Sequence, residues 1–136
     1  MAYYIDTSAL VKFVVAEPES STLHRWLIEE DPVLVSCDLA RTELIRAVRL
    51  AGGDMVRARL VLSSITLTTL SGATFTAAAL LEPPLLRSLD AVHIAAALEL
   101  GDDLDGLVTY DTRMADAATH QGIPMLAPGP DDERAR

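Results

Sequence analysis

The sequence predicts a single α/β domain with a small parallel sheet and helices on both of its faces. Short apolar segments of strand length alternate with longer segments of helical periodicity, which is the pattern of βαβ units. The chain has 136 residues, of which 50% are apolar, so it is long enough to bury a substantial core. We assign residues 1–127 to this domain and residues 128–136 to a polar C-terminal tail that we expect to be frayed.

Five segments bounded by turn residues are predicted to be strands, because β-branched and aromatic side chains favour extended backbone. They are residues 3–5, 33–36, 65–70, 107–110 and 124–127. Helices are expected where apolar residues recur at helical spacing between capping residues and glycine or proline stops. These helices cover residues 9–15, 20–30, 39–51, 55–63, 72–82, 89–100 and 112–120. The candidate N-caps are Ser20 or Ser21, Asp38, Asp54 and Ser88.

The expected helix at residues 89–100 is apolar on nearly every side, which predicts a central position covered by other elements. The acidic segment 102–106 after it is expected to be a solvated loop. Trp26 and Cys37 are interpreted as core residues, with a partner contact as the alternative for Trp26. His93 lies one turn after Asp90, and a lone histidine on such a helix is more often packing than chemistry.

Net charge and composition restrict the classes of partner. A net charge of −9 argues against nonspecific attraction to a polyanion, although five arginines between residues 41 and 59 face only two acids. Metal cations bound to acids would make such a site less negative. No apolar run reaches the roughly 18 residues of a membrane span, and no basic leader precedes the first apolar run. With a single cysteine and no internal disulfide, we expect a cytoplasmic protein.

Four acids occupy positions that a parallel sheet brings to one edge. Asp6 and Asp111 directly follow strands, and Glu43 and Asp90 lie in the first turns of helices. Crowded carboxylates raise one another's pKa unless a cation offsets their charge, and hard oxygen ligands suit Mg²⁺ or Mn²⁺. A metal held in this way supports hydrolysis of a phosphodiester. The sequence therefore predicts a metal site of this class.

Each acid also has a purely structural explanation. Asp6 can cap a helix, and Asp111 can favour the positive end of its helix. Glu43 can be one acid on a solvated helix face that pairs with Arg46 or Arg49. Asp90 is explained less well, because it opens a strongly apolar helix where an unpaired acid is costly. Together the four acids favour the metal site.

Three further polar residues are candidates for a supporting role. Ser8 and Thr109 stand beside the predicted ligands and can orient a carboxylate or a water, with local capping as the alternative. Asp116 follows Asp111 by five residues and would add a fifth acid, with a solvent-facing helix position as the alternative.

Four elements follow one another in a fixed order along the chain: IDTSALVK at 5–12, Glu43 in its helix, RSLDAVHIA at 87–95 and VTYD at 108–111. In these residues the chain resembles the PIN domain family over residues 3 to about 127, in particular the VapC toxins of bacterial toxin–antitoxin pairs. No single motif is decisive, but the ordered set with its spacing is specific.

The resemblance implies a metal-dependent endoribonuclease in which the four acids hold Mg²⁺ or Mn²⁺ and act on RNA, for example a structured RNA such as tRNA or rRNA. It also implies a homodimer and a cognate VapB-type antitoxin whose C-terminal segment covers the acidic site. Such antitoxins usually carry the DNA-binding module, so this chain is expected to have no DNA binding of its own. From the lack of a long apolar run, no membrane association is expected either. The candidates for RNA contacts are Arg41, Arg46, Arg49, Arg87 and Arg113.

Two alternatives belong to other functional classes. The chain can be a non-catalytic binding module that keeps the PIN fold. An aspartate-based phosphatase or a receiver domain shares an acidic edge on a parallel sheet, but the sequence speaks against both. The phosphatase pattern needs an acid two residues after Asp6, where Ser8 stands, and a receiver needs a lysine after a late strand, whereas Lys12 is the only lysine.

Overall fold

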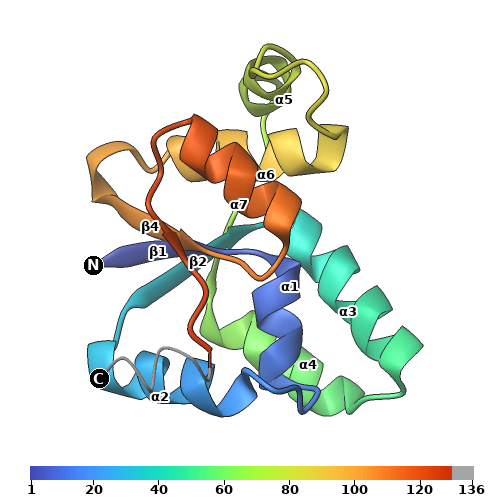
Figure 1. Ribbon diagram of the computed structural model, residues 1–136. Coiled ribbons are helices and arrows are strands. Elements are labelled where there is room, and N and C mark those ends of the chain that lie inside the picture. The colour runs from blue at the N-terminus through green and yellow to red at the C-terminus, as the bar shows by residue number, and fades with distance from the viewer. Residues whose placement is uncertain (130–136) are drawn as a thin grey trace.

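The computed structural model describes residues 1–129 and contains one five-stranded parallel sheet (Figure 1). Its strands lie in the order β3-β2-β1-β4-β5, and all neighbouring pairs are parallel. The chain order reverses between β1 and β4, which lie side by side at the centre and form the switch point of the sheet. The strands are β1 (Ala2–Ile5), β2 (Val33–Cys37), β3 (Thr66–Thr68), β4 (Leu104–Val108) and β5 (Met125–Leu126).

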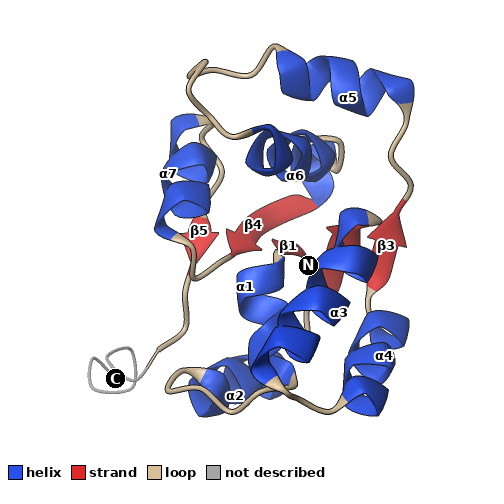
Figure 2. Cartoon of the chain, turned by 90° about the vertical axis from the view of Figure 1, so that its right-hand side faces the viewer, coloured by secondary structure: helices blue, strands red, loops and turns tan. Residues whose placement is uncertain are grey.

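Helices cover both faces of this sheet, as the sequence predicts. In Figure 2, α5, α6 and α7 lie on one side of the strands and α1 to α4 on the other. Within the described residues, no helix combines the length and the apolar character that crossing a membrane requires. The helices are α1 (Thr7–Leu10), α2 (Ser20–Glu30), α3 (Leu39–Ala51), α4 (Met55–Ser64), α5 (Gly72–Ala79), α6 (Ser88–Leu98) and α7 (Thr112–His120), with 3₁₀ turns η1 (Val11–Phe13) and η2 (Gly101–Asp103).

Alternation along the central strands sends neighbouring side chains into two different cores. Ile5 and Val108 pack with α1 to α4, while Tyr4 and Leu107 pack with α6 and α7. Every residue from 91 to 97 of α6 is buried, which confirms the predicted central position of this helix. Trp26 and Cys37 are buried as well, so their interpretation as core residues is confirmed.

The expected loop at residues 102–106 is wrong in its second half. β4 already begins at Leu104, where it pairs with Ala2 of β1 across a register shift. Asp105 points to solvent from this strand and its carboxylate accepts a hydrogen bond from the Ala2 amide at 2.9 Å. The acidic side chains predicted a loop because acids are rare in strands. At this edge of the sheet, however, the backbone of residues 104–106 pairs with β1 while Asp105 stays exposed.

The helix caps follow the prediction only in part. The Asp54 carboxylate accepts hydrogen bonds from the Val56 and Arg57 amides, which confirms it as the cap of α4. Ser88 is the first residue of α6 and not its cap. Asp38 precedes α3 in helical rather than extended backbone, and its carboxylate binds Arg41 instead of a helix amide.

The described chain ends near the start of α2, where the Cβ position of Gly129 lies 3.8 Å from Glu19 Cγ. Pro128 is buried, and its carbonyl accepts a hydrogen bond from the Tyr110 hydroxyl. Most of the tail that was expected to be frayed, residues 130–136, lies outside the described residues.

Gly106 allows β4 to lie between β1 and β5 at close range. A Cβ at this position would lie 3.0 Å from the Pro124 carbonyl oxygen and 3.0 Å from a ring carbon of Tyr3. The Pro124 carbonyl cannot retreat without losing its hydrogen bond from the Leu107 amide, and the Tyr3 ring is packed edge-on against Trp26.

We expect Gly106→Ala to lower the free energy of unfolding by about 1 to 3 kcal/mol, because the added methyl overpacks a rigid site. Urea denaturation of the purified chain measures this change. Gly72→Ala is the matched control: nothing lies within 4 Å of its Cβ position, and alanine suits the start of α5. A Gly106→Ala variant as stable as Gly72→Ala would show that the contact is not restrictive.

Candidate active site

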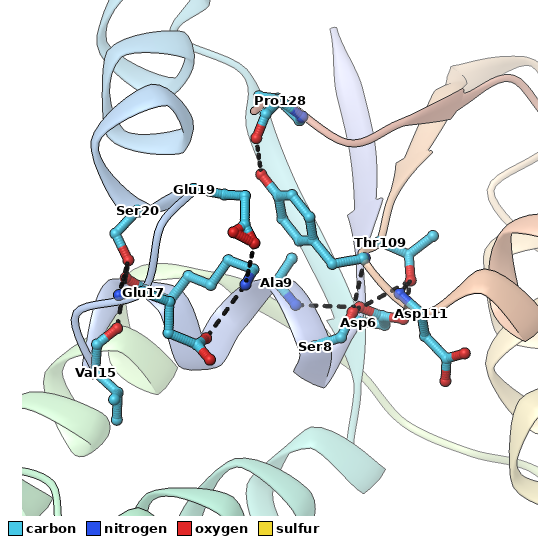
Figure 3. Close-up of polar contacts among 12 residues, drawn as sticks. Asp6, Ser8, Ala9, Val15, Glu17, Glu19, Ser20, Thr109, Asp111 and Pro128 are labelled. Atoms are coloured by element: carbon cyan, nitrogen blue, oxygen red, sulfur yellow. Dashed lines mark hydrogen bonds and ion pairs between the residues drawn. The ribbon is translucent and has the colours of Figure 1, made fainter. Parts of the chain in front are cut away.

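Asp6 stands at the end of β1 and is almost completely buried, with 4% of its surface exposed. It is the N-cap of α1, where its Oδ1 accepts hydrogen bonds from the Ala9 amide at 3.3 Å and the Ser8 hydroxyl at 2.6 Å. Its Oδ2 accepts one from the Thr109 hydroxyl at 2.5 Å (Figure 3). Burial raises the pKa of Asp6, and these donors oppose the rise because they stabilise the charged form.

Ser8 and Thr109 do more than contact one carboxylate. The Ser8 hydroxyl also accepts a hydrogen bond from the Tyr110 amide at 2.9 Å and lies 3.2 Å from the Thr109 hydroxyl. Thr109 Oγ1 in turn accepts one from the Asp111 amide at 3.1 Å. These bonds join the end of β1 to the turn after β4, so two acids that are distant in sequence are held at one sheet edge.

His93 is buried in α6 and connects Glu43 to the core. Its Nε2 lies 2.6 Å from Glu43 Oε1 and its Nδ1 lies 2.7 Å from the Tyr4 hydroxyl, with Cys37 Sγ at 3.7 Å. The Thr7 hydroxyl also donates to Glu43 Oε1, at 3.2 Å. Burial alone lowers the pKa of His93, but hydrogen bonds with Cys37 and Glu43 and their negative charge outweigh it and raise the pKa to about 10.

The interpretation of His93 as simple packing is therefore incomplete. The side chain is buried, as expected, but it is bonded to one of the predicted ligands. The available signal was the three-residue spacing from Asp90, which puts both side chains on the same side of α6. Its partner on another helix, Glu43, cannot be found from that spacing.

Asp90 and Asp111 complete the acidic edge. Asp90 lies in the first turn of α6, and Asp111 is the N-cap of α7, where its Oδ1 accepts the Arg113 amide at 2.9 Å. Burial raises the pKa of Asp90, and the negative charge of Asp111 raises it further. The charges of His93, Arg87 and Arg113 oppose this rise.

The donor chemistry of this edge fits a hard cation. Within residues 1–129, no hydrogen bond is accepted by Glu43 Oε2, by Asp111 Oδ2 or by either oxygen of Asp90. A cation would also offset the burial and repulsion that raise the pKa of Asp90. In the described part of the chain, however, no three His, Cys, Asp or Glu side chains form a group arranged to hold a metal ion. The metal site therefore stays a prediction.

The five arginines predicted to contact RNA lie in three different places. Arg87 and Arg113 line a cavity together with Asp90 and Asp116, and Asp116 is exposed on α7. Arg46 and Arg49 line a second cavity along α3, which no predicted ligand borders. Arg41 is bonded to Asp38 at 3.0 Å and borders a third. Among these three cavities, only the one lined by Arg87 and Arg113 also contains a predicted ligand, Asp90.

Lys12 has a structural environment of its own. It is buried, its Nζ lies 3.3 Å from Glu17 Oε1 and 3.1 Å from Glu19 Oε1, and it stands 4.5 Å from the centre of the Tyr110 ring. Both glutamates are drawn in Figure 3, apart from the cluster around Asp6. A lysine held in this way does not serve the receiver-like alternative.

A single α/β domain with acids at the switch point of a parallel sheet is the class of protein that the fold and the site define. The sequence profile of the PIN domain family matches residues 3–119. The chain belongs to this family, and the expected fold class is confirmed.

Proteins named ribonuclease VapC match nearly the whole chain. Ribonuclease VapC46 of Mycobacterium tuberculosis (strain ATCC 25618 / H37Rv) is 44% identical over 128 residues, which cover 93% of this chain and 98% of the relative. Ribonuclease VapC47 of M. tuberculosis (strain CDC 1551 / Oshkosh) is 36% identical over 131 residues, covering 93% and 96%. Ribonuclease VapC35 of the same strain is 36% identical over 130 residues, with the same coverage. The resemblance to VapC proteins is thereby confirmed.

The contact between Tyr4 and His93 leads to a stability prediction. Tyr4→Phe removes the hydroxyl and leaves a buried imidazole nitrogen with only a distant sulfur, so we expect a loss of about 1 to 3 kcal/mol. Tyr3→Phe is the matched control, because the Tyr3 hydroxyl makes no hydrogen bond within residues 1–129. It should change stability by less than about 0.5 kcal/mol. Equal urea midpoints for Tyr4→Phe and Tyr3→Phe would show that the hydrogen bond between Tyr4 and His93 does not stabilise the fold.

Proposed function

We propose that this chain is a metal-dependent endoribonuclease and the toxin of a VapBC-type toxin–antitoxin pair. The observation that carries the proposal is similarity along nearly the whole chain to three proteins named ribonuclease VapC. The geometry supports it, because four acids stand at the sheet edge where ligands bind in open α/β folds.

The reaction is hydrolysis of an RNA phosphodiester. An oxygen of water bonds to phosphorus, one phosphorus–oxygen ester bond breaks, and the leaving oxygen takes a proton. The residues that would hold Mg²⁺ or Mn²⁺ are Asp6, Glu43, Asp90 and Asp111. When bound, the cation supplies charge neutralisation at the scissile phosphate.

The chain's own contacts orient these acids. Ser8 and Thr109 fix both oxygens of Asp6. His93 and Thr7 both bind Glu43 through Oε1, so Oε2 has no competing hydrogen bond from residues 1–129. Pre-oriented ligands lose little freedom when they bind, and hydrogen bonds of this kind favour the charged form of a carboxylate.

The partners follow from the same family membership. We propose a VapB-type antitoxin that covers the acidic edge, a structured RNA as substrate, and a homodimer. An apolar cavity of about 490 Å³ between α2 and α4, bordered by Leu27, Leu34 and Val61, offers a surface for a partner segment. Exposed apolar side chains on and after α5 offer another for a second copy: Phe75 is 49% and Leu80 76% exposed.

The nuclease proposal predicts the effect of Asp90→Asn. We expect cleavage to fall by a factor on the order of 10² or more, because even contacts to metal ligands cost 10- to 100-fold when removed. The fold should be retained, since Asp90 accepts no hydrogen bond from residues 1–129 and asparagine removes a charge that burial and Asp111 disfavour. The assay is cleavage of total cellular RNA with Mg²⁺ or Mn²⁺ and with EDTA, using protein freed of antitoxin.

Asp102→Asn is the control for this experiment, since it makes the same chemical change on the exposed turn η2. It should cleave like the parent chain. A folded Asp90→Asn variant with unchanged cleavage would remove Asp90 from the site. Absence of cleavage by the folded, metal-supplied parent chain would favour the non-catalytic binding module instead.

The dimer proposal has a separate test. Light scattering should give twice the chain mass of 14.6 kDa. We expect Leu80→Glu to shift the protein to monomer, because a charge in an apolar interface is costly to bury. Leu50→Glu is the control, since Leu50 is 92% exposed on α3, away from α5. A parent chain that is monomeric at all concentrations would contradict the proposal.

A further inference from the structure

A cavity of about 460 Å³ borders Asp90 and lies between the loop before α6 and the outer side of α7. The Gln121 side chain, just after α7, donates a hydrogen bond to the Glu82 carbonyl at 2.7 Å and ties the two walls together. The volume falls within the roughly 300 to 1,000 Å³ of small-ligand sites. A cavity next to a candidate catalytic acid is placed to hold the part of a substrate that flanks the reacting bond.

One part of this lining is apolar. Pro83, Leu85 and Leu86 contribute side chains from the loop, and Ala117 contributes from α7. The Leu85 side chain is 96% exposed, so almost none of its apolar surface is covered by other residues of this chain. His120 lies on the same lining and offers an aromatic ring. Unpaired bases of RNA are recognised by stacking on aromatic rings, on guanidinium planes and on apolar surfaces of this type.

The other part of the lining carries two positive and two negative side chains. Arg87 and Arg113 stand against Asp90 and Asp116. Among the described residues, neither guanidinium lies within ion-pair distance of a carboxylate, in contrast to Arg41, which binds Asp38. Two arginines without ion pairs can bind a phosphate in a bidentate manner, while the two acids keep the cavity from attracting anions indiscriminately.

From this lining we infer that the cavity binds one nucleotide of the RNA strand, next to the phosphodiester that is cut. The base lies against Leu85 and His120, and the adjoining phosphate is bound by Arg87 and Arg113. The inference rests on the proposed ribonuclease function and deepens it by naming a substrate contact. The cavities lined by Arg46 and Arg49, and by Arg41 and Arg59, border none of the four acids and do not serve this purpose.

The direct test is binding of AMP and of inorganic phosphate to the isotope-labelled full chain in EDTA, followed by NMR. AMP should shift amide signals of residues 85–90 and 113–120 and should bind at least about threefold more tightly than phosphate, because the base adds stacking contacts. Equal affinity for the two probes, or shifts confined to other residues, would overturn the inference.

Three variants separate the two halves of the proposed site. Arg87→Gln and Arg113→Gln should each weaken both probes by a factor of about ten, whereas Leu85→Ser should weaken AMP only. Arg46→Gln is the matched control and should leave both affinities unchanged. If Arg46→Gln lost AMP binding, or if the two arginine variants kept the affinity of the parent chain, the proposed roles of Arg87 and Arg113 would be contradicted.

Kinetics on an RNA that the parent chain cleaves give the second readout. Arg113→Gln should raise KM about tenfold with kcat changed less than about threefold, because it removes a binding contact and no candidate ligand. A parent chain that cleaves RNA while both arginine variants keep its KM would overturn the inference alone. A parent chain that cuts no RNA in the nuclease assay fails the proposed function, and AMP binding is measured independently of that result.

Discussion

The buried carboxylate of Asp6 is the constraint on which the site depends. A carboxylate taken out of water is costly unless donors replace its hydration. Its donors come from two segments, Ser8 and Ala9 at the start of α1 and Thr109 beyond the end of β4. These contacts require β1 and β4 to be neighbours, and that adjacency is the switch point of the sheet. The same hydrogen bonds that make the acid tolerable therefore also bring Asp111 to it.

His93 plays the corresponding part on the other side of β1. Its ring meets the Tyr4 hydroxyl, the Cys37 sulfur and the Glu43 carboxylate, which belong to β1, β2 and α3. One side chain of α6 thus fixes the distance between this helix, the sheet and α3. Burial raises the pKa of the Cys37 thiol, but its contacts with His93 and Tyr4 outweigh this and lower it. Such a network is rigid only while all its members are bonded.

The sequence was sufficient for the fold and for the positions of the acids. Strand and helix patterns are local, and parallel connectivity then places every strand end at one edge, so the place of Asp6 followed from pattern alone. Asp111 was expected directly after a strand, but β4 ends at Val108 and two residues lie between. Contacts between helices could not be read in this way. The bond from His93 to Glu43 spans 50 residues, and the separation of Arg87 and Arg113 from the other arginines depends on which helices adjoin. The start of β4 was predicted wrongly because acids dominate residues 102–105, although Leu104 already pairs with Ala2 of β1.

The net charge of −9 does not by itself prevent a nucleic acid from reaching this edge. At physiological ionic strength the Debye length is about 8 Å, so acids on the far faces of the molecule are largely screened. What an approaching phosphate meets is the local set of charges. The positive charges of Arg87 and Arg113 oppose the raised pKa of Asp90, so both act on this end of the acidic edge. The two guanidinium groups, together with a bound cation, would offset the negative charge of this edge, while the distant acids contribute little.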